Sequence, residues 1–490
     1  MNPLPLSRPR RAAVPYRRAG AATSAPARRA ATAVAAAIPL VLLGACAPAG
    51  SAGADGAAAT PSASESRAAT ESQSRTARIA VTYDGGVKVL DALSLEEVGD
   101  IPLDGFNRLN PAGDERHLMV STTGGFQVLD LGTWAAAHGD HAHYRTADPA
   151  LTDVTYPATE PGHVVVHEGR TALFDDGTGQ ISVLDADHVA DGEVARAETL
   201  PTPHHGVAVE LGDDTLVVSE GTEDERTGIR VLDADGEEIA ASDECPGVHG
   251  EAMAADEAVL IGCEDGAILV RDGEITKVDA PDSYGRIGNQ AGSEESPVVL
   301  GDYKVDRDAE LERPERVSLI DTRSGELTLV DLPSSYTFRS LARGDDGEAL
   351  ILGTDGRVHV IDPEKGKLTD SIEVIDAWEE PLEWQEPRPA ILALDGSVYV
   401  TDPANDAIHA VDVETGEVWK SAQLGVAANE IAGVMGEAPE HDAHEGHDHE
   451  GEGAGHEDDR HGDDAHEGDG HEDDAHEDDE HDEHDEQQEG

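Results

Sequence analysis

The segment from His138 to Tyr144 concentrates side chains that bind divalent metal ions. Its sequence, His-Gly-Asp-His-Ala-His-Tyr, supplies the imidazoles of His138, His141 and His143 and the carboxylate of Asp140. Imidazole and carboxylate groups are ligands for borderline-soft cations such as Zn²⁺. We therefore expect a metal-binding loop here, and a solvated polar loop is the alternative.

Three further segments place histidines in short apolar runs that have the pattern of β-strands. They are residues 161–169 with His163 and His167, residues 203–209 with His204 and His205, and residues 248–252 with His249 and Glu251. Successive side chains of a strand point to opposite faces, so only one of His204 and His205 can face a shared site. His163 and His167 lie about 13 Å apart along an extended strand, too far to bind one ion together.

We expect a site of three or four ligands, built from His141, His143, His167 and one of His204 or His249. The full set of candidate metal ligands is His138, Asp140, His141, His143, His167, His204 and His249. Residues that could orient these ligands through hydrogen bonds, without binding the metal themselves, are Glu251, His163 and His205.

The elements that must position these histidines are repeated strands. No long amphipathic helical pattern divides the chain, whereas a motif like Val-x-Val-Leu-Asp recurs every 40 to 55 residues or so, roughly the period of a four-stranded propeller blade. Copies occur at residues 87–91, 126–130, 181–185, 229–233, 317–321, 358–362 and 408–412, with a degenerate copy at 267–271. The alternation within each copy predicts a half-buried strand that ends in an acidic turn.

These copies predict an all-β fold, an eight-bladed β-propeller. The segment 429–434 has the pattern of a lone inner strand, and the first repeat lacks one, so we expect the C-terminal strand to complete the first blade. Such closure removes exposed sheet edges. A tandem of β-sandwiches is the competing architecture. In a propeller, blades three to five would bring their histidines to one mouth of the central channel, and the His138–His143 loop could fold over them.

The N-terminus has the features of a lipoprotein export signal. Residues 1–31 contain seven arginines and no acidic residue, and the apolar run that follows ends at Leu-Gly-Ala-Cys46. A basic region, a short apolar region and small residues before the cleavage site are typical of secretory signals, and the run is too short to span a bilayer. We expect a signal peptide at 1–45, lipidation of Cys46 and a flexible tether at 46–75; an uncleaved anchor or an ordinary secretory signal is the alternative.

Two cysteines remain once Cys46 carries lipid, namely Cys245 and Cys263. In an exported protein a single pair most simply forms a disulfide. The alternative is a thiolate metal site, which an oxidising exterior disfavours.

The C-terminal segment is composed almost entirely of charged and histidine residues. Residues 441–490 contain 11 histidines and 24 acidic residues and almost nothing apolar, so they cannot bury a core and should be disordered. We expect the propeller to occupy 76–436 and a tail at 437–490 to capture divalent metal at many weak sites, rather than only to keep the protein soluble. Examples of its ligands are His441, His444, His447, His449 and His456.

Several of these motifs, taken in order, resemble the AztD family of exported zinc metallochaperones. They are His-Gly-Asp-His-Ala-His-Tyr, Gly-His-Val-Val-Val-His-Glu-Gly, Pro-His-His-Gly-Val, Cys-Pro-Gly-Val-His-Gly-Glu-Ala and Gly-Cys-Glu-Asp-Gly, within the span 78–434. The resemblance implies an eight-bladed propeller that binds Zn²⁺ outside the cytoplasm. It also implies transfer of the ion to AztC, the zinc-binding protein of an ABC importer. The apparent lipid anchor and the long acidic tail depart from the family pattern.

The charge of the chain limits the remaining function classes. A formal net charge of −69 would repel phosphate, so we expect no nucleic-acid partner. We predict a monomeric zinc carrier that is not an enzyme and that is held by lipid on the outer face of a bacterial cell membrane. The alternative is a metal-dependent hydrolase or lactonase of the propeller type, in which Glu251 or Asp302 could serve as the general base.

Overall fold

Each copy of the repeated motif forms the third strand of a four-stranded antiparallel sheet, and the described residues contain eight sheets of this kind. In β3 (Gly85–Asp91), Val87, Val89 and Leu90 are almost completely buried although they point to both faces. Val87 and Val89 pack toward the second sheet, and Leu90 packs toward the eighth. The prediction that these strands are half-buried was therefore wrong, because a neighbouring sheet covers each face.

The structure is a computed structural model that describes residues 68–138 and 141–438. The described residues all belong to the unit that begins at Pro61. The predicted signal peptide, Cys46, most of the predicted tether, Asp140 and the histidines of the predicted tail lie outside the described residues. Within the described ranges, no helix is long and apolar enough to cross a membrane.

The first four sheets follow one another along the chain, each written here from its innermost strand outward. They are β36 (Ile431–Val434), β2 (Arg78–Tyr83), β3, β4 (Glu97–Leu103); β5 (Arg108–Pro111), β6 (His117–Thr122), β7 (Gly125–Asp130), β10 (Ala150–Pro157); β11 (Pro161–His167), β12 (Arg170–Asp175), β13 (Gln180–Asp185), β14 (Arg196–Thr199); and β15 (Ala208–Glu210), β16 (Leu216–Gly221), β17 (Arg226–Leu232), β18 (Glu238–Ser242).

The last four sheets repeat this order. They are β19 (His249–Ala254), β20 (Ala258–Cys263), β21 (Asp265–Arg271), β22 (Glu274–Asp279), with β23 (Gly285–Arg286) added on β21; β24 (Gln290–Ala291), β25 (Val298–Asp302), β26 (Arg316–Asp321), β27 (Glu326–Asp331); β28 (Leu341–Arg343), β29 (Ala349–Leu352), β30 (Arg357–Asp362), β31 (Lys367–Glu373); and β32 (Ile391–Leu394), β33 (Ser397–Asp402), β34 (Ala407–Asp412), β35 (Glu417–Gln423). One short 3-10 helix, η2 (Ala186–His188), interrupts the strands of the described chain.

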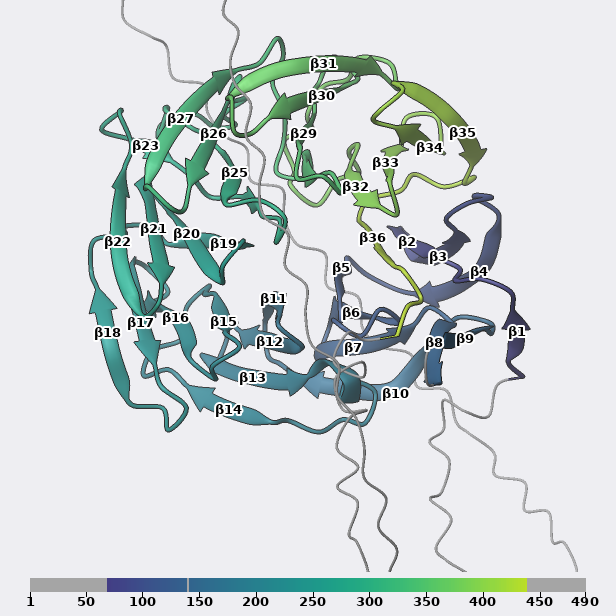
Figure 1. Ribbon diagram of the computed structural model, residues 1–490, viewed down its shortest axis with the longest axis horizontal. Coiled ribbons are helices and arrows are strands. Elements are labelled where there is room, and N and C mark those ends of the chain that lie inside the picture. The colour runs from purple at the N-terminus through teal and green to yellow at the C-terminus, as the bar shows by residue number, and fades with distance from the viewer. Residues whose placement is uncertain (1–67, 139–140, 439–490) are drawn as a thin grey trace, which may run out of the picture. The chain divides into compact units, whose positions relative to one another are not determined.

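The sheets follow one another around a common centre, with their first strands innermost (Figure 1). The ring closes where β36 pairs antiparallel with β2, with Arg78 opposite Val434 and Val81 opposite Ile431. The predicted completion of the first blade by the C-terminal strand is therefore confirmed. The all-β propeller architecture is confirmed with it.

A separate three-stranded sheet does not belong to the eight sheets of the ring. Strands β8 (Thr133–His138) and β9 (His141–Thr146) form a hairpin inserted between β7 and β10, and β1 (Thr70–Ser72) pairs with β9. The base of the hairpin is fixed by Arg116, whose guanidinium bonds both carboxylate oxygens of Asp130 and lies over the Trp134 ring at 4.1 Å. The histidine-rich loop of the sequence is the tip of this hairpin.

Cys245 and Cys263 are joined by a disulfide, as predicted. Cys245 lies just before β19 and Cys263 ends β20, so the bond ties the entry of the fifth sheet to its second strand. It thereby holds the segment that leads into His249.

Removal of the closing strand should destabilise the whole ring. In a chain that ends at Gly425, the burial of Ala432 and Val434 and the four residue pairs between β36 and β2 are lost. We expect the free energy of unfolding to fall by at least about 3 kcal/mol, as measured by urea denaturation. A chain that ends at Ala438 keeps β36 and is the matched control. Equal stability of the two chains would contradict the closure.

Candidate metal centre

Three histidines from three neighbouring sheets converge at one end of the innermost strands. His163 lies in β11, His205 lies in the loop before β15, and His249 is the first residue of β19. Their rings are 5.0 to 5.6 Å apart between centroids, and one nitrogen from each lies within 4.8 Å of the others. We refer to His163, His205 and His249 as the channel triad.

The spacing within the channel triad is suitable for one zinc ion. The Nε2 atoms of His205 and His249 are 3.1 Å apart. Two ligands that bind zinc at 2.0–2.1 Å with a tetrahedral angle are about 3.3 Å apart. Two neutral rings this close would otherwise have to share a proton between the two nitrogens. A metal ion between the rings satisfies both lone pairs at once.

An oxygen acceptor holds the second nitrogen of each ring. Nδ1 of His163 lies 3.0 and 3.2 Å from the two carboxylate oxygens of Glu251, and Nδ1 of His205 lies 2.5 Å from Asp176. When Nδ1–H donates to such an acceptor, the tautomer is fixed and the Nε2 lone pair is left for a metal. Carboxylate acceptors also make the imidazoles more basic, and hence better ligands.

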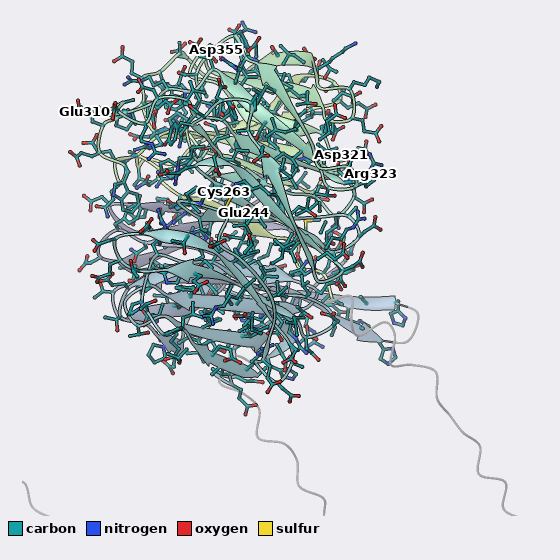
Figure 2. All side chains as sticks on the ribbon, turned by 90° about the vertical axis from the view of Figure 1, so that its left-hand side faces the viewer. Glu244, Cys263, Glu310, Asp321, Arg323 and Asp355 are labelled. Atoms are coloured by element: carbon teal, nitrogen blue, oxygen red, sulfur yellow. A yellow bond between two sulfur atoms is a disulfide. The ribbon has the colours of Figure 1, made fainter. Side chains whose placement is uncertain are left out.

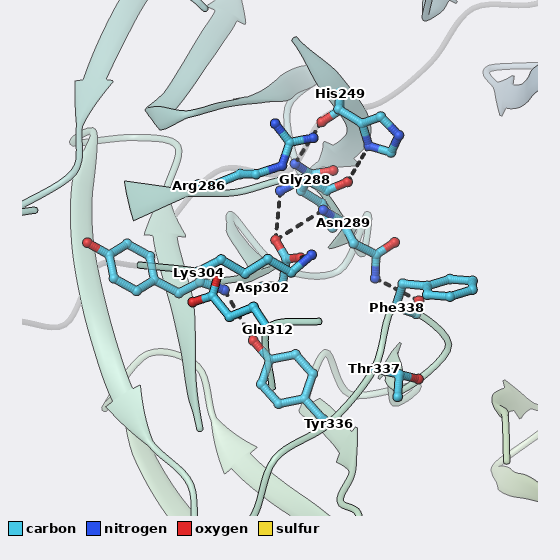
Figure 3. Close-up of polar contacts among 12 residues, drawn as sticks. His249, Arg286, Gly288, Asn289, Asp302, Lys304, Glu312, Tyr336, Thr337 and Phe338 are labelled. Atoms are coloured by element: carbon cyan, nitrogen blue, oxygen red, sulfur yellow. Dashed lines mark hydrogen bonds and ion pairs between the residues drawn. The ribbon is translucent and has the colours of Figure 1, made fainter. Parts of the chain in front are cut away.

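A backbone carbonyl plays the same part for the third ring. Nδ1 of His249 donates to the carbonyl oxygen of Gly288 at 2.6 Å. That carbonyl is held in turn by Asp302, whose Oδ1 accepts the N–H groups of Gly288 at 2.7 Å and Asn289 at 3.1 Å, while Oδ2 pairs with Lys304 at 3.1 Å (Figure 3). The orientation of His249 therefore depends on a chain of contacts that starts at a buried carboxylate.

Local irregularities of the strands aim two of these rings. The pairing of β11 with β12 shifts register between Pro161 and Val164, and that of β19 with β20 shifts between His249 and Glu251. Such bulges re-aim side chains. Gly250 has a φ of +74°, and a Cβ atom there would lie 2.9 Å from the Gly288 carbonyl oxygen. Glycine at this position therefore permits the close approach that His249 requires.

The pKa values of His163 and His249, two partly buried rings, are shifted in opposite directions. Burial lowers the pKa of His249 well below 6.5, and nearby His163 and His205 lower it further. Burial also acts to lower the pKa of His163, but the charge and hydrogen bond of Glu251 outweigh it and the pKa is raised. In the metal-free protein, His249 is thus neutral and ready to bind, whereas His163 is the ring at which protons compete with a metal.

A cavity of about 550 Å³ opens onto the channel triad. Its other lining residues include Arg108, Asn110, Arg286 and Gln290. Three protein ligands and an accessible cavity match the arrangement in which zinc keeps a fourth position for an external ligand.

The hairpin carries a second group of histidines. His138, His141 and His143 have ring centroids 5.1 to 5.6 Å apart, and one nitrogen of each lies within 4.8 Å of the others. His143 Nδ1 lies 3.5 Å from a carboxylate oxygen of Glu71 in β1. His138 and His141 are exposed. We refer to these three residues as the hairpin triad.

The two triads lie on opposite faces of the propeller. Strand β5 starts at Arg108, which lines the channel-triad cavity, and runs away from it; β6 returns, and β7 runs away again and leads into the hairpin. In Figure 2 the hairpin projects on the side of Asp321 and Arg323, whereas Glu310, in the loop that follows β25, lies on the other side. The expectation that the loop folds over the channel histidines is therefore incorrect.

Two predicted ligands lie apart from both triads. His204 is buried, with Nε2 at 2.9 Å from Ser219 Oγ and Nδ1 at 3.0 Å from the carbonyl of Thr202. Of the adjacent pair it points inward and His205 faces the cavity. His167 is also buried, and its ring nitrogens have no hydrogen-bond partner among the described residues.

The sequence predicted that His163 and His205 orient the metal ligands without binding the ion, whereas the structure places both in the channel triad beside His249. The spacing argument separates His163 from His167 and alternation separates His204 from His205, but neither determines which residue of each pair faces the cavity. Glu251 does orient an imidazole, as expected, but that of His163 and not that of its strand neighbour His249. Asp176 and the Gly288 carbonyl were missed, since neither has a sequence signal that separates it from an ordinary turn residue.

Comparison with known proteins was made for sequence and for fold. No protein-family model matches the chain. The zinc chaperone AztD of Citrobacter koseri is 28% identical over 383 residues, which cover 74% of this chain and 88% of that protein. A crystal structure of Citrobacter koseri AztD superposes with a TM-score of 0.64 at 25% identity, over 74% of this chain and 98% of that one. A structure of apo AztD from the same organism gives 0.63 at 24% identity, with the same coverage. The resemblance to the AztD family that the motifs indicated is therefore confirmed in both sequence and fold.

Proposed function

We propose that this protein is an extracytoplasmic zinc carrier that holds one Zn²⁺ on the Nε2 atoms of His163, His205 and His249. The observation that carries the proposal is that one nitrogen of each of the three rings converges, with the Nε2 atoms of His205 and His249 3.1 Å apart, while an oxygen acceptor holds each Nδ1. The similar Citrobacter koseri protein is named a zinc chaperone. The recipient we propose is the zinc-binding protein of an ABC importer, AztC-like in kind.

The ligand set supports a carrier that can release its cargo. Three neutral imidazoles leave the ion its full positive charge and a fourth position open to the cavity, where a ligand of the recipient can enter before the carrier's ligands leave. The carboxylates that an enzyme could use as general bases are engaged elsewhere. Glu251 contacts His163, and Asp302 contacts two backbone amides and Lys304.

The hairpin triad and the C-terminal tail are proposed to collect metal. β36 runs away from the channel-triad face, and the Gly436 amide bonds to the carbonyl of Glu115 on the hairpin face. The tail therefore starts on the side of the hairpin triad. With the proposed lipid at Cys46, the protein would gather zinc as a monomer at the outer surface of the membrane, and we propose Asp140 as a further ligand.

Substitution of the channel triad tests the proposal. In a chain that ends at Ala438, His163→Ala/His249→Ala should lower zinc affinity by more than about 100-fold, because loss of a direct ligand exceeds the effect of losing a supporting contact. Competition against a chelator of known affinity measures this. The control is His138→Ala/His141→Ala/His143→Ala, which should keep the tight site. Tight binding that survives the first change and disappears with the second would contradict the assignment.

Substitution of Glu251 tests the support of His163. Glu251→Gln keeps the shape but removes the charge that raises the pKa of His163. Zinc affinity at pH 7.5 should fall about 10-fold. In the unchanged protein, affinity should decline as the pH falls through the raised pKa of His163, because protons then occupy the ligand.

In Glu251→Gln this decline should begin at lower pH, since the strongest influence that opposes burial on the His163 pKa is then removed. Isothermal titration between pH 5.5 and 7.5 measures both effects. Glu294→Gln, at an exposed carboxylate near His167, is the matched control. Identical pH profiles for Glu251→Gln and the unchanged protein would contradict the role of Glu251.

A further inference from the structure

An apolar ridge is exposed on the same face as the channel triad. Trp384 is 52% exposed and Leu382 is 66% exposed. The ring of Phe106 meets the Trp384 ring edge-on, with centroids 5.0 Å apart. We refer to Phe106, Leu382 and Trp384 as the Trp384 ridge. Large exposed apolar groups that gather in one place commonly mark sites of protein contact.

The Trp384 ridge borders the metal centre. Trp384 lines the same cavity of about 550 Å³ as His163, His205 and His249. It also lines a cavity of about 540 Å³ with Phe106 and one of about 280 Å³ with Leu382. The exposed Trp384 side chain therefore lies between three cavities, one of which contains the metal ligands.

The loop that presents Trp384 is braced from within. The Arg388 side chain is 1% exposed and donates to a Glu380 carboxylate oxygen at 3.0 Å and to the Glu383 carbonyl at 2.8 Å. Asn429 donates to the Gln385 carbonyl at 2.9 Å. A tryptophan held in an exposed position by such contacts loses little conformational entropy when a partner covers it.

Basic side chains line the cavity between Trp384 and the channel triad, although the chain as a whole carries a formal net charge of −69. Arg108, Arg286 and Lys304 line this cavity, together with one carboxylate, that of Glu251. On the other side of Trp384 the cavity that it shares with Phe106 is lined by Glu383 and Glu386. The charge around the channel triad therefore favours a partner that directs a carboxylate into this cavity while an apolar side chain covers Trp384.

Two other occupants fit less well. Residues 441–490 are rich in carboxylates but contain no aromatic or large aliphatic side chain, so they cannot cover Trp384 and Leu382. A second copy related by two-fold symmetry would bring the same arginine and lysine side chains toward each other, which is unfavourable. A separate protein matches both the apolar and the charged parts.

We propose that the Trp384 ridge is the docking site of the protein that receives the zinc ion, through an apolar side chain that covers Trp384 and a carboxylate that enters the cavity beside it. Docking here places the partner's incoming ligand in the cavity that leads to the open coordination position of the channel triad. The inference rests on the proposed carrier function, and it names the surface by which the ion leaves.

The test uses the full mature chain and the purified zinc-free zinc-binding protein of the importer. Trp384→Ala and Leu382→Ala are compared with Trp419→Ala and Leu93→Ala, which remove exposed side chains of the same types outside the cavities around the channel triad. Three quantities are measured for each: zinc affinity by chelator competition, the Kd of the protein complex by biolayer interferometry, and the rate of zinc transfer.

We expect Trp384→Ala to weaken the complex about 30-fold or more and to slow transfer in proportion, with zinc affinity unchanged. Leu382→Ala should weaken the complex less, and both controls should leave it unchanged. Wild-type binding of the partner by Trp384→Ala, equal weakening in Trp419→Ala, or no complex with the unchanged protein would each overturn the docking inference. A complex that depends on Trp384 in a protein whose channel triad binds no zinc would support the docking site and refute the proposed function.

Discussion

The metal centre depends on hydrogen bonds that face away from it. Each ring of the channel triad donates Nδ1–H to an oxygen, from Glu251, from Asp176 or from the backbone of Gly288. Without those acceptors the rings would be free to flip or to share protons, since two of their nitrogens are 3.1 Å apart. The acceptors belong to different sheets from the rings they hold, or to loops between sheets. The site therefore exists only when the third, fourth and fifth sheets and the loop that leads into the sixth are packed together.

The direction of the strands places the channel triad and the hairpin triad on opposite faces of the propeller. Every innermost strand runs from the channel-triad face to the hairpin face, so the hairpin after β7 and the described end of the chain after β36 both lie on the second face. In the proposed function, capture takes place there, and delivery takes place beside the Trp384 ridge. The basic lining of the cavity between Trp384 and the channel triad contrasts with the acidic balance of the chain, which otherwise disfavours contact with acidic proteins.

Much of the fold could be predicted, because it follows from a repeated pattern. The motif ending in Asp marks every third strand, and the unpaired patterns at residues 78–83 and 429–434 predicted the closure. The ligands were harder to predict because alternation shows that only one of His204 and His205 can face the cavity, but not which one, and spacing likewise does not choose between His163 and His167. Glu251 could be found from its spacing, whereas Asp176 becomes a neighbour of His205 only when the third and fourth sheets are side by side.

The most direct test is a crystal structure of the zinc-loaded full mature chain, with anomalous diffraction measured on both sides of the zinc absorption edge. The account predicts an anomalous peak bonded to the Nε2 atoms of His163, His205 and His249 at about 2.0–2.1 Å, with the Nδ1 contacts unchanged. A peak on the hairpin triad alone, or zinc bound through Nδ1 with the contacts to Glu251 and Asp176 broken, would contradict it.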